Sequence, residues 1–357
     1  MKKVAICIPT YNNLNSLKRL LESIRIQSYK DYCVVITDDS TDNEIQEFIE
    51  DYKDVDILYY KNEKSLGSAR NTNHSIAIAQ QNNPEYIKIM YHDDYFSFFY
   101  SLERMVMLIE AHPETDIVFS GTYEVGSDFK YSRSITKEQA EKLQKDYRHI
   151  FLGNCIGAPS ATIVRNNNIV LDENMIWEVD VEWYFRILKN NNLFIYTPEP
   201  LVSIGRGESQ VTQTCLCNPR LMLEESYYFY SKHEELHEEK FMVRVLKLLG
   251  QQLHREQLLE YCKKKKKVYI YGAGVNGKAC RHLLESNNRD FAGYVVSDGK
   301  KTAKEVEGKP VFEFGEIENI DGDYGIILAV KRKTIQQILE ILNRSKMDYF
   351  VYKREME

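Results

Sequence analysis

KVAICIPTYNNLNSLKRLLESI, residues 3–24, joins a short apolar run to a segment with apolar residues at helical spacing. The run at residues 3–8 is short and rich in β-branched side chains, which predicts a buried strand. The apolar positions that follow predict an amphipathic helix, and they are Leu14, Leu17, Leu20, Leu21 and Ile24. A strand followed directly by a helix is the unit of a parallel α/β sheet.

The same alternation continues over the first 120 residues. Further short strands are predicted at residues 32–37, 56–60, 85–90 and 116–120, and a helix is predicted around residues 102–109. Strands and helices in alternation predict a parallel sheet whose ligand sites lie where the strands end.

The alternation is lost between residues 121 and 215, which predicts an α+β half that covers a substrate. We expect helices near 136–148 and at 179–190, a strand within 154–165, and a strand at 192–197 that Pro198 ends. Residues 219–262 are predicted to be helical. The predicted organisation is a first domain at 1–215, a helical connector at 216–262 and a second domain at 263–357.

Composition excludes several classes of protein. The chain has 357 residues, which favours two domains of roughly 100 to 200 residues each. Its formal net charge of -6 argues against a nucleic-acid partner. Seven cysteines without a CxxC motif favour reduced thiols in the cytoplasm. The apolar run at 4–8 is too short for a signal or membrane-spanning segment.

A run of five lysines at 263–267 precedes the second domain. A solvated edge before a strand is the favoured interpretation of this run, and a patch that binds an anionic membrane surface is the alternative. The predicted location is therefore the cytoplasm, with peripheral association at the inner face of the membrane as the second possibility.

Four polar motifs converge at the carboxyl ends of the first sheet. They are IPTYN (8–12), TDDSTD (37–42), SLGSARN (65–71) and YHDD (91–94). Within YHDD, Asp93 and Asp94 repel one another and are costly to desolvate. The pair therefore requires a cation, a proton or open water.

These motifs, followed by EVDVEW (178–183), resemble in kind and order the family-2 glycosyltransferases with the GT-A fold. The resemblance covers about residues 3–215. It implies a GT-A type nucleotide-sugar-binding sheet with an α+β acceptor half. It also implies transfer of a sugar from a nucleotide donor with inversion at the anomeric carbon, and the favoured donor is UDP-linked. The implied acceptor is a glycan or a lipid-linked molecule, as in surface polysaccharide biosynthesis.

The resemblance implies a donor site built from the first three motifs. Pro9 and Tyr11 belong to its PTYN start, and Asp39 would accept from a uracil N–H while Asp38 supports the loop. Arg70 would lie near the base or the diphosphate, where its guanidinium suits anionic oxygens. The family's glycine after the aspartate pair is missing here. Turn chemistry at the end of a strand is the alternative for the two aspartates.

YHDD stands where the family has its DxD motif, which implies Mn²⁺ or Mg²⁺ at the donor diphosphate. Asp94 is the expected metal ligand and Asp93 the expected contact to sugar or ribose. Tyr91 replaces the first acid of the motif. His92 is expected to be a neighbour and not a ligand, because hard cations prefer oxygen.

EVDVEW implies the catalytic base. Asp180 falls six residues before Arg186, as an acid does in the family, and would deprotonate the acceptor hydroxyl. The alternative is that the acids of this segment form a first helical turn that favours negative charge. GRGESQVT (205–212) lies where the family often has an RxH segment, so Arg206 would add positive charge near the diphosphate.

A second βαβ unit begins after the lysines with YIYGAGVNGKAC. Gly272, Gly274 and Gly277 fit GxGxxG between a strand and a helix, and Asp298 follows Gly277 by 21 residues. The segment resembles Rossmann-like nucleotide-binding domains. NAD(H), a nucleotide sugar and no ligand at all are the alternatives, and a structural or oligomerising module is another.

Two other functions are kept beside glycosyl transfer. One is an NAD-dependent or nucleotide-sugar-modifying enzyme whose chemistry lies in the second domain. The other is a nucleotide-sugar-binding protein without turnover.

Overall fold

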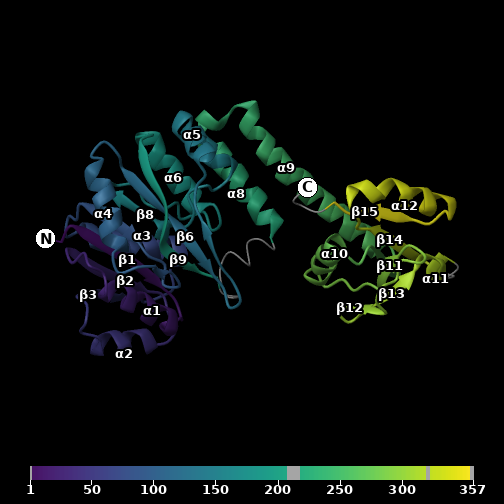
Figure 1. Ribbon diagram of the computed structural model, residues 1–357, viewed down its shortest axis with the longest axis horizontal. Coiled ribbons are helices and arrows are strands. Elements are labelled where there is room, and N and C mark those ends of the chain that lie inside the picture. Colours follow the sequence, from purple (N-terminus) through teal and green to yellow (C-terminus); the bar gives the residue numbers. More distant parts are fainter. Residues whose placement is uncertain (1, 207–217, 319–321, 354–357) are drawn as a thin grey trace. The chain divides into compact units, whose positions relative to one another are not determined.

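The computed structural model describes residues 2–206, 218–318 and 322–353 of the chain (Figure 1). The chain divides into two compact units, Met1–Val245 and Leu246–Glu357. Each unit has its own sheet and its own apolar cores. The two units are therefore described separately.

The first unit contains nine strands in its described residues. They are β1 (Val4–Thr10), β2 (Tyr32–Asp38), β3 (Ile57–Lys61), β4 (Tyr86–Ile89), β5 (Tyr95–Phe96), β6 (Ile117–Val125), β7 (Lys130–Arg133), β8 (Thr162–Arg165) and β9 (Phe194–Gly205). Its α-helices are α1 (Leu14–Arg25), α2 (Glu44–Asp51), α3 (Ser68–Gln80), α4 (Ser101–Ala111), α5 (Lys137–Lys145), α6 (Val179–Asn190) and α8 (Pro219–Lys232). Short 3-10 turns are η1 (Tyr147–Leu152), η2 (Pro159–Ala161) and η3 (Glu234–Leu236).

The strands of this unit form one sheet in the order β3-β2-β1-β4-β8-β6-β9-β5, with β7 added at β6. Strand β1 runs parallel to β2 and β4, and β2 runs parallel to β3. Strand β8 is antiparallel to both β4 and β6. The parallel first half and the mixed second half confirm the predicted GT-A type sheet.

Helices cover both faces of this sheet, and β1 shows why. All seven of its residues are buried. Val4, Ile6 and Ile8 pack into the core that contains α1 and α4, whereas Ala5 and Cys7 pack into the core that contains α3 and α6. A strand buried on both faces must be apolar throughout, as this one is up to its end.

The predicted end of the strand at 192–197 is wrong, because β9 passes both of its prolines and continues to Gly205. A bulge accommodates them: Ser120 pairs with Thr197 and Gly121 with Pro200, so two residues of β9 loop out. A Cβ on Gly121 would lie 2.4 Å from the carbonyl oxygen of Pro198. The glycine therefore makes room for the bulge.

The predicted strand within residues 154–165 is shorter than expected. Only its last four residues form β8, and η2 with a proline at its start precedes them. The predicted helix at 179–190 is confirmed by α6.

Helix α9 (Glu239–Lys263) crosses the division between the units. Its residues Phe241 and Val245 belong to a core of the first unit, and Leu258 and Cys262 belong to a core of the second. The predicted connector at 216–262 is thus shared between the units, with α8 in the first. Among the described residues, no helix has both the length and the apolar character that a membrane span requires.

The second unit is a smaller α/β unit. Its strands are β10 (Lys267–Tyr271), β11 (Gly293–Val296), β12 (Glu305–Val306), β13 (Lys309–Glu313), β14 (Tyr324–Leu328) and β15 (Tyr349–Val351), and its further helices are α10 (Val275–Glu285), α11 (Phe314–Glu318) and α12 (Arg332–Arg344). The spatial order is β12-β13-β11-β10-β14-β15, and all neighbours except β12 and β13 are parallel. With its first strand in the middle, this is the order of a doubly wound sheet.

Candidate active site

The loops that leave β1 and β2 are tied to each other at the carboxyl end of the sheet. Asn12 has a φ of 48°, and its backbone N–H donates to Oγ of Ser40 at 2.8 Å. Its Oδ1 accepts from the backbone N–H of Thr41 at 2.9 Å. Pro9 is buried within β1, whereas the side chain of Tyr11 is exposed beside this junction.

Asp38 ends β2, and its side chain is completely buried. Its Oδ2 accepts from the hydroxyl of Tyr59 at 2.7 Å and lies 3.3 Å from Nζ of Lys61. Its Oδ1 accepts from the backbone N–H of Ser40 at 2.8 Å. These contacts join β2, β3 and the following turn, so Asp38 supports the loop.

Asp39 is buried and holds the loop before α3. Its Oδ2 accepts from the backbone N–H groups of Leu66 at 2.9 Å and Gly67 at 2.8 Å, and from the hydroxyl of Ser65 at 3.2 Å. Gly67 is the N-cap of α3, so the carboxylate of Asp39 holds the backbone at the residue where this helix begins. Its Oδ1 accepts from the side-chain amide of Asn62 at 2.7 Å.

Arg70 lies in the first turn of α3 and is largely exposed. Its Nε donates to Glu173 at 3.1 Å. Glu173 also accepts from the side-chain amide of Asn73 at 3.1 Å. The structure therefore places the guanidinium of Arg70 in a surface ion pair at this edge.

The two aspartates that follow β4 have different surroundings. Asp94 is 2% exposed, and its Oδ1 accepts from the backbone N–H of Gly205 at the end of β9 at 3.2 Å. Burial, followed by the negative charge of Asp93, raises the pKa of Asp94 well above its ordinary value. Asp93 is partly exposed, and its carbonyl oxygen accepts from Nη2 of Arg19 at 2.6 Å.

A buried lysine lies below this turn. Lys88 in β4 is completely buried, and its Nζ donates to the carbonyl oxygen of Ser160. Burial lowers the pKa of Lys88 to about 7, while the charge of Asp94 acts in the opposite direction. Oγ of Ser160 accepts from the backbone N–H of Tyr91 at 3.0 Å. Lys88 and Ser160 therefore fix the strand end from within.

The YHDD turn offers a divalent cation some of its ligands and not a complete set of protein ligands. Among the described residues, no three side chains of His, Cys, Asp and Glu gather so that they could hold a metal. Divalent cations on nucleotides take one or two carboxylates and complete the shell with phosphate oxygens and water. Asp93 presents a partly exposed oxygen donor of this kind. Asp94, the expected ligand, is buried, and its Oδ1 already accepts from the backbone N–H of Gly205.

Tyr91 brings the strand end and the predicted base together. Burial and then the charge of Asp180 raise the pKa of the Tyr91 hydroxyl, with further contributions from Asp94 and Asp93. Burial and Asp180 likewise raise the pKa of Tyr184, whose hydroxyl donates to the carbonyl oxygen of Gly157 at 3.1 Å. The tyrosine that replaces an acid in YHDD is therefore within the electrostatic range of Asp180.

Asp180 is the second residue of α6 and is partly buried. Its Oδ2 accepts from the side-chain amide of Asn154 at 2.9 Å, and its Oδ1 accepts from the backbone N–H of Val181 at 2.8 Å. Burial raises the pKa of this carboxyl to about 7. A carboxyl with a pKa near neutrality can accept and release a proton under physiological conditions.

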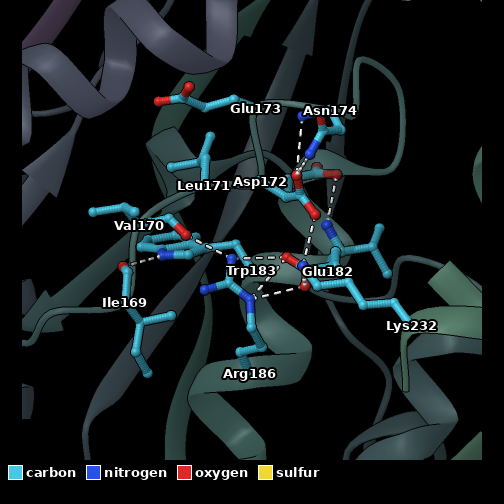
Figure 2. A network of polar contacts seen from close by, with 12 residues as sticks. Ile169, Val170, Leu171, Asp172, Glu173, Asn174, Glu182, Trp183, Arg186 and Lys232 are labelled. Atoms are coloured by element: carbon cyan, nitrogen blue, oxygen red, sulfur yellow. Dashed lines mark hydrogen bonds and ion pairs between the residues drawn. The ribbon is translucent and has the colours of Figure 1, made fainter. Parts of the chain in front are cut away.

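The neighbouring acids of EVDVEW are neutralised by cations. Glu178 is paired with Arg244, and Glu182 lies 2.7 Å from Nη2 of Arg186 and 2.8 Å from Nζ of Lys232. Figure 2 shows the Glu182 cluster, in which Lys232 also reaches Asp172 at 2.6 Å. Asp180 has no ion pair within the described parts of the chain. The alternative of a simple acidic first turn therefore accounts for its two neighbours better than for Asp180.

Glu225 of α8 fixes the start of α6. Its Oε1 accepts from the backbone N–H of Ile176 at 2.7 Å, and its Oε2 accepts from those of Trp177 and Glu178, both at 2.8 Å. Glu178 is the N-cap of α6 and does not cap it with its own side chain. A buried carboxylate from another helix therefore sets the position of Asp180.

Arg206 follows β9, and its guanidinium lies 2.5 Å from the buried carboxylate of Glu124 in β6. Its backbone N–H donates to the carbonyl oxygen of Val125 at 2.7 Å. The rest of the predicted RxH-like segment, residues 207–212, lies outside the described residues.

In the second unit, two of the three glycines of GAGVNG have packing reasons. Gly272 has a φ of 113°, and a Cβ on Gly277 would lie 1.8 Å from the carbonyl oxygen of Gly272. A Cβ on Gly274 would have no atom within 4 Å, so open space adjoins this residue. Asp298 accepts from the backbone N–H of Gly315 at 2.8 Å, at the start of α11. Asp298 thus already has a structural partner.

The fold brings the YHDD turn within the electrostatic range of Asp180, because the charges of Asp180, Asp94 and Asp93 all act on Tyr91, although about 90 residues separate the turn from Asp180 in sequence. Sequence reasoning missed the structural partners of this site. Asn154 and Glu225 belong to no recognisable motif, and only the folded chain brings them to α6. A buried polar residue far from any motif gives no signal in a single sequence.

Comparison with known proteins gives a family match, similar solved structures and curated relatives. Residues 5–169 match the family described as Glycosyl transferase family 2. The crystal structure of S. aureus TarS 1-349 in complex with UDP-GlcNAc has a TM-score of 0.53 at 19% identity and covers 71% of this chain and 72% of that chain. At this identity the likeness shows the fold. The family match falls within the first unit, which also has the GT-A-like sheet, so the first unit resembles the domains of enzymes that transfer sugars.

Two curated relatives share parts of the sequence. An uncharacterized glycosyltransferase of Methanocaldococcus jannaschii is 27% identical over 197 residues, which are 54% of this chain and 66% of that protein. The UDP-Glc:alpha-D-GlcNAc-diphosphoundecaprenol beta-1,3-glucosyltransferase WfaP of Escherichia coli is 32% identical over 96 residues, which are 27% of this chain and 37% of that protein. The similar region thus spans just under two thirds of the first relative and about a third of the second.

Proposed function

We propose that the whole chain transfers a sugar from a UDP-linked donor to a hydroxyl of a glycan or lipid-linked acceptor, with inversion, in surface polysaccharide biosynthesis. One observation carries this proposal: Asp180, whose pKa burial raises to about 7, is close enough to the YHDD turn for its charge to act on the hydroxyl of Tyr91. The similarity to TarS, whose structure contains UDP-GlcNAc, and to WfaP, a glucosyltransferase that acts on a sugar-diphosphoundecaprenol, supports the donor and acceptor classes.

In the proposed reaction Asp180 is the general base. Its carboxylate takes the proton of the acceptor hydroxyl as that oxygen forms a bond to the anomeric carbon. The bond between this carbon and the diphosphate oxygen breaks on the opposite face, and the nucleoside diphosphate leaves with the electron pair. The product therefore has inverted configuration. Asn154 holds Oδ2 of Asp180 and orients the carboxylate.

Asp39 is the proposed contact to the uracil N–H. Its Oδ2 accepts from three protein donors, whereas its Oδ1 accepts from the side-chain amide of Asn62. A carboxylate oxygen accepts about two hydrogen bonds, which leaves Oδ1 capacity for a base. Tyr11 and Arg70 lie at the same edge and complete the proposed donor site.

Asp93 is the proposed ligand of Mn²⁺ or Mg²⁺, in place of Asp94. A bound cation would neutralise charge on the leaving diphosphate. Asp94 and Lys88 hold the turn from the buried side, and Arg19 holds the carbonyl of Asp93. Three contacts therefore fix the backbone that carries the proposed ligand.

We also propose that the second unit is a Rossmann-like domain, with NAD(H) or a nucleotide as its candidate ligand. Its strand order and the open space beside Gly274 support this. A lipid-linked acceptor would bring the chain to the inner face of the membrane, which extends the predicted cytoplasmic location to peripheral association.

The test uses the full chain with a panel of UDP-sugars, Mn²⁺ and synthetic N-acetylglucosamine-diphosphate lipid. UDP release measures donor turnover, and mass spectrometry of the lipid measures transfer. Asp180→Asn should retain UDP binding and lose transfer at least 100-fold, within the range expected for a general base. Asp51→Asn, at the exposed end of α2, is the matched control. Transfer by Asp180→Asn at the wild-type rate would remove the proposed base, and absence of UDP release with every donor would remove the proposed function.

A further inference from the structure

The hairpin of β6 and β7 carries two exposed aromatic side chains that stack on each other. Phe129 is 49% exposed and Tyr131 is 55% exposed. Their ring centroids lie 5.8 Å apart, and the rings are inclined by only 27°. Exposed aromatic side chains are costly in water, and a stacked pair of them is typical of a binding surface.

The turn of the hairpin holds this pair in place. The backbone N–H of Gly126 donates to the carbonyl oxygen of Phe129 at 3.0 Å and closes the turn. A Cβ on Gly126 would lie 2.4 Å from the ring of Phe129, so the ring rests directly on the glycine backbone. Nζ of Lys130 lies 4.0 Å from the ring centroid of Tyr123 and is thereby directed toward β6. The two rings are therefore preorganised.

Strand β7 links this pair to Asp180. Side chains alternate along a strand, so Tyr131 and Arg133 project from the same face, about 7 Å apart along β7. Nη2 of Arg133 donates to the carbonyl oxygen of Asn154 at 2.8 Å. The side-chain amide of Asn154 donates to Asp180 at 2.9 Å. Tyr131 therefore shares a face of β7 with Arg133, which contacts Asn154, and Asn154 donates to the proposed base.

We propose that Phe129 and Tyr131 form a carbohydrate-binding platform for the acceptor glycan, on the strand from which Arg133 contacts Asn154, the residue that donates to Asp180. This inference rests on the proposed function and names a part of the acceptor site. A sugar ring has an apolar face of C–H groups and a polar rim. The flat face of an aromatic ring buries the former, and the tyrosine hydroxyl stays in water near the latter.

The charges on the hairpin favour a glycan over an anionic lipid surface. Asp128 and Lys130 flank Phe129 with opposite charges, and both are exposed. Attraction to an anionic membrane requires clustered basic residues, each of which contributes about 1 kcal/mol. The hairpin tip carries no such cluster, whereas stacking on a neutral sugar requires none.

The experiment compares Phe129→Ala/Tyr131→Ala with the wild type in the full chain. Binding of N-acetylglucosamine oligosaccharides is followed by saturation-transfer NMR, and transfer to the N-acetylglucosamine-diphosphate lipid is followed by mass spectrometry. We expect the double variant to weaken oligosaccharide binding and to raise the acceptor KM about tenfold, with UDP release in the absence of acceptor unchanged. Tyr131→Phe keeps the ring and should bind as the wild type does.

Phe99→Ala is the matched control, because Phe99 is another exposed aromatic residue, located before α4. Equal oligosaccharide binding by the double variant and the wild type would overturn the platform, as would a wild type that binds none of the oligosaccharides. A double variant that loses only its binding to phosphatidylglycerol vesicles would also overturn it. Failure of the proposed function is seen separately, as absence of UDP release from any donor, because the NMR measurement requires no turnover.

Discussion

The carboxylate of Glu225 accepts a hydrogen bond from the backbone N–H of Glu178 at 2.8 Å, two residues before Asp180. The N-terminus of α6 leaves backbone donors without partners inside the helix, and α8 provides the acceptor for them. Glu225, which is distant in sequence, thus holds the backbone at the start of the helix that carries Asp180. Glu225 is a positioning residue and does not itself touch the reacting atoms.

Glu225→Ala should lower both stability and activity. Loss of the carboxylate leaves the backbone N–H groups of Ile176, Trp177 and Glu178 without their acceptor, and the buried one at Glu178 alone costs about 2 kcal/mol in the free energy of unfolding. The start of α6 also becomes free to shift, so kcat should fall more than the donor KM rises. Urea unfolding and steady-state kinetics measure the two effects. Glu224→Ala, in which only an exposed pair with Arg220 is lost, should change neither.

The rate of transfer should rise with pH through about 7, because Asp180 must be ionised to accept a proton and burial raises its pKa to about 7. A pH profile of kcat/KM measures this. A profile that is flat from pH 5 to about pH 8 would contradict the role of Asp180.

The free energy of unfolding should fall over the pH range in which the rate of transfer rises. In the unfolded chain the carboxyl of Asp180 ionises near its ordinary pKa of 3.8, so stability falls as the pH rises from that value to about 7. Each unit of the shift corresponds to about 1.4 kcal/mol. Asp180→Asn has no such titration. The Tm of Asp180→Asn should therefore rise relative to that of the wild type between pH 4 and about pH 8, as measured by differential scanning calorimetry.

The two aspartates of the YHDD turn should give different results when UDP and Mn²⁺ are added. Asp93→Asn should lose the part of the Tm increase that requires Mn²⁺, because it removes the partly exposed ligand. Asp94→Asn should retain much of it, since the amide oxygen can still accept from Gly205. If Asp94→Asn loses the Mn²⁺-dependent part of the Tm increase and Asp93→Asn retains it, Asp94 is the metal ligand and not Asp93.

The glycine turn of the second unit allows a matched pair of variants. Gly277→Ala should destabilise the chain by about 1–3 kcal/mol, because the new Cβ would meet the carbonyl oxygen of Gly272. Gly274→Ala should fold normally, since nothing lies within 4 Å of its Cβ position. Thermal unfolding tests both. If the turn binds a nucleotide, Gly274→Ala should weaken that binding without a change in Tm.

Much of the fold could be predicted because local pattern and tertiary structure agree. The apolar run before Pro9 and the leucines after it formed β1 and α1, and the same alternation produced the parallel half of the sheet. The prolines of β9 misled the prediction, because a bulge opposite Gly121 absorbs them. A single sequence does not reveal that a partner strand can make such room.

The sequence by itself determined which residue types stand at the ends of the strands, and hence the donor motifs and the acidic segment around Asp180. Only the tertiary structure decided their surroundings. It buried Asp94 and left Asp93 partly exposed, paired Glu178 and Glu182 with cations, and brought Tyr91 within the electrostatic range of Asp180. The reason is physical: the charge state of a carboxyl depends on the solvent and partners around it, and distant segments such as α8 supply these only when the chain folds.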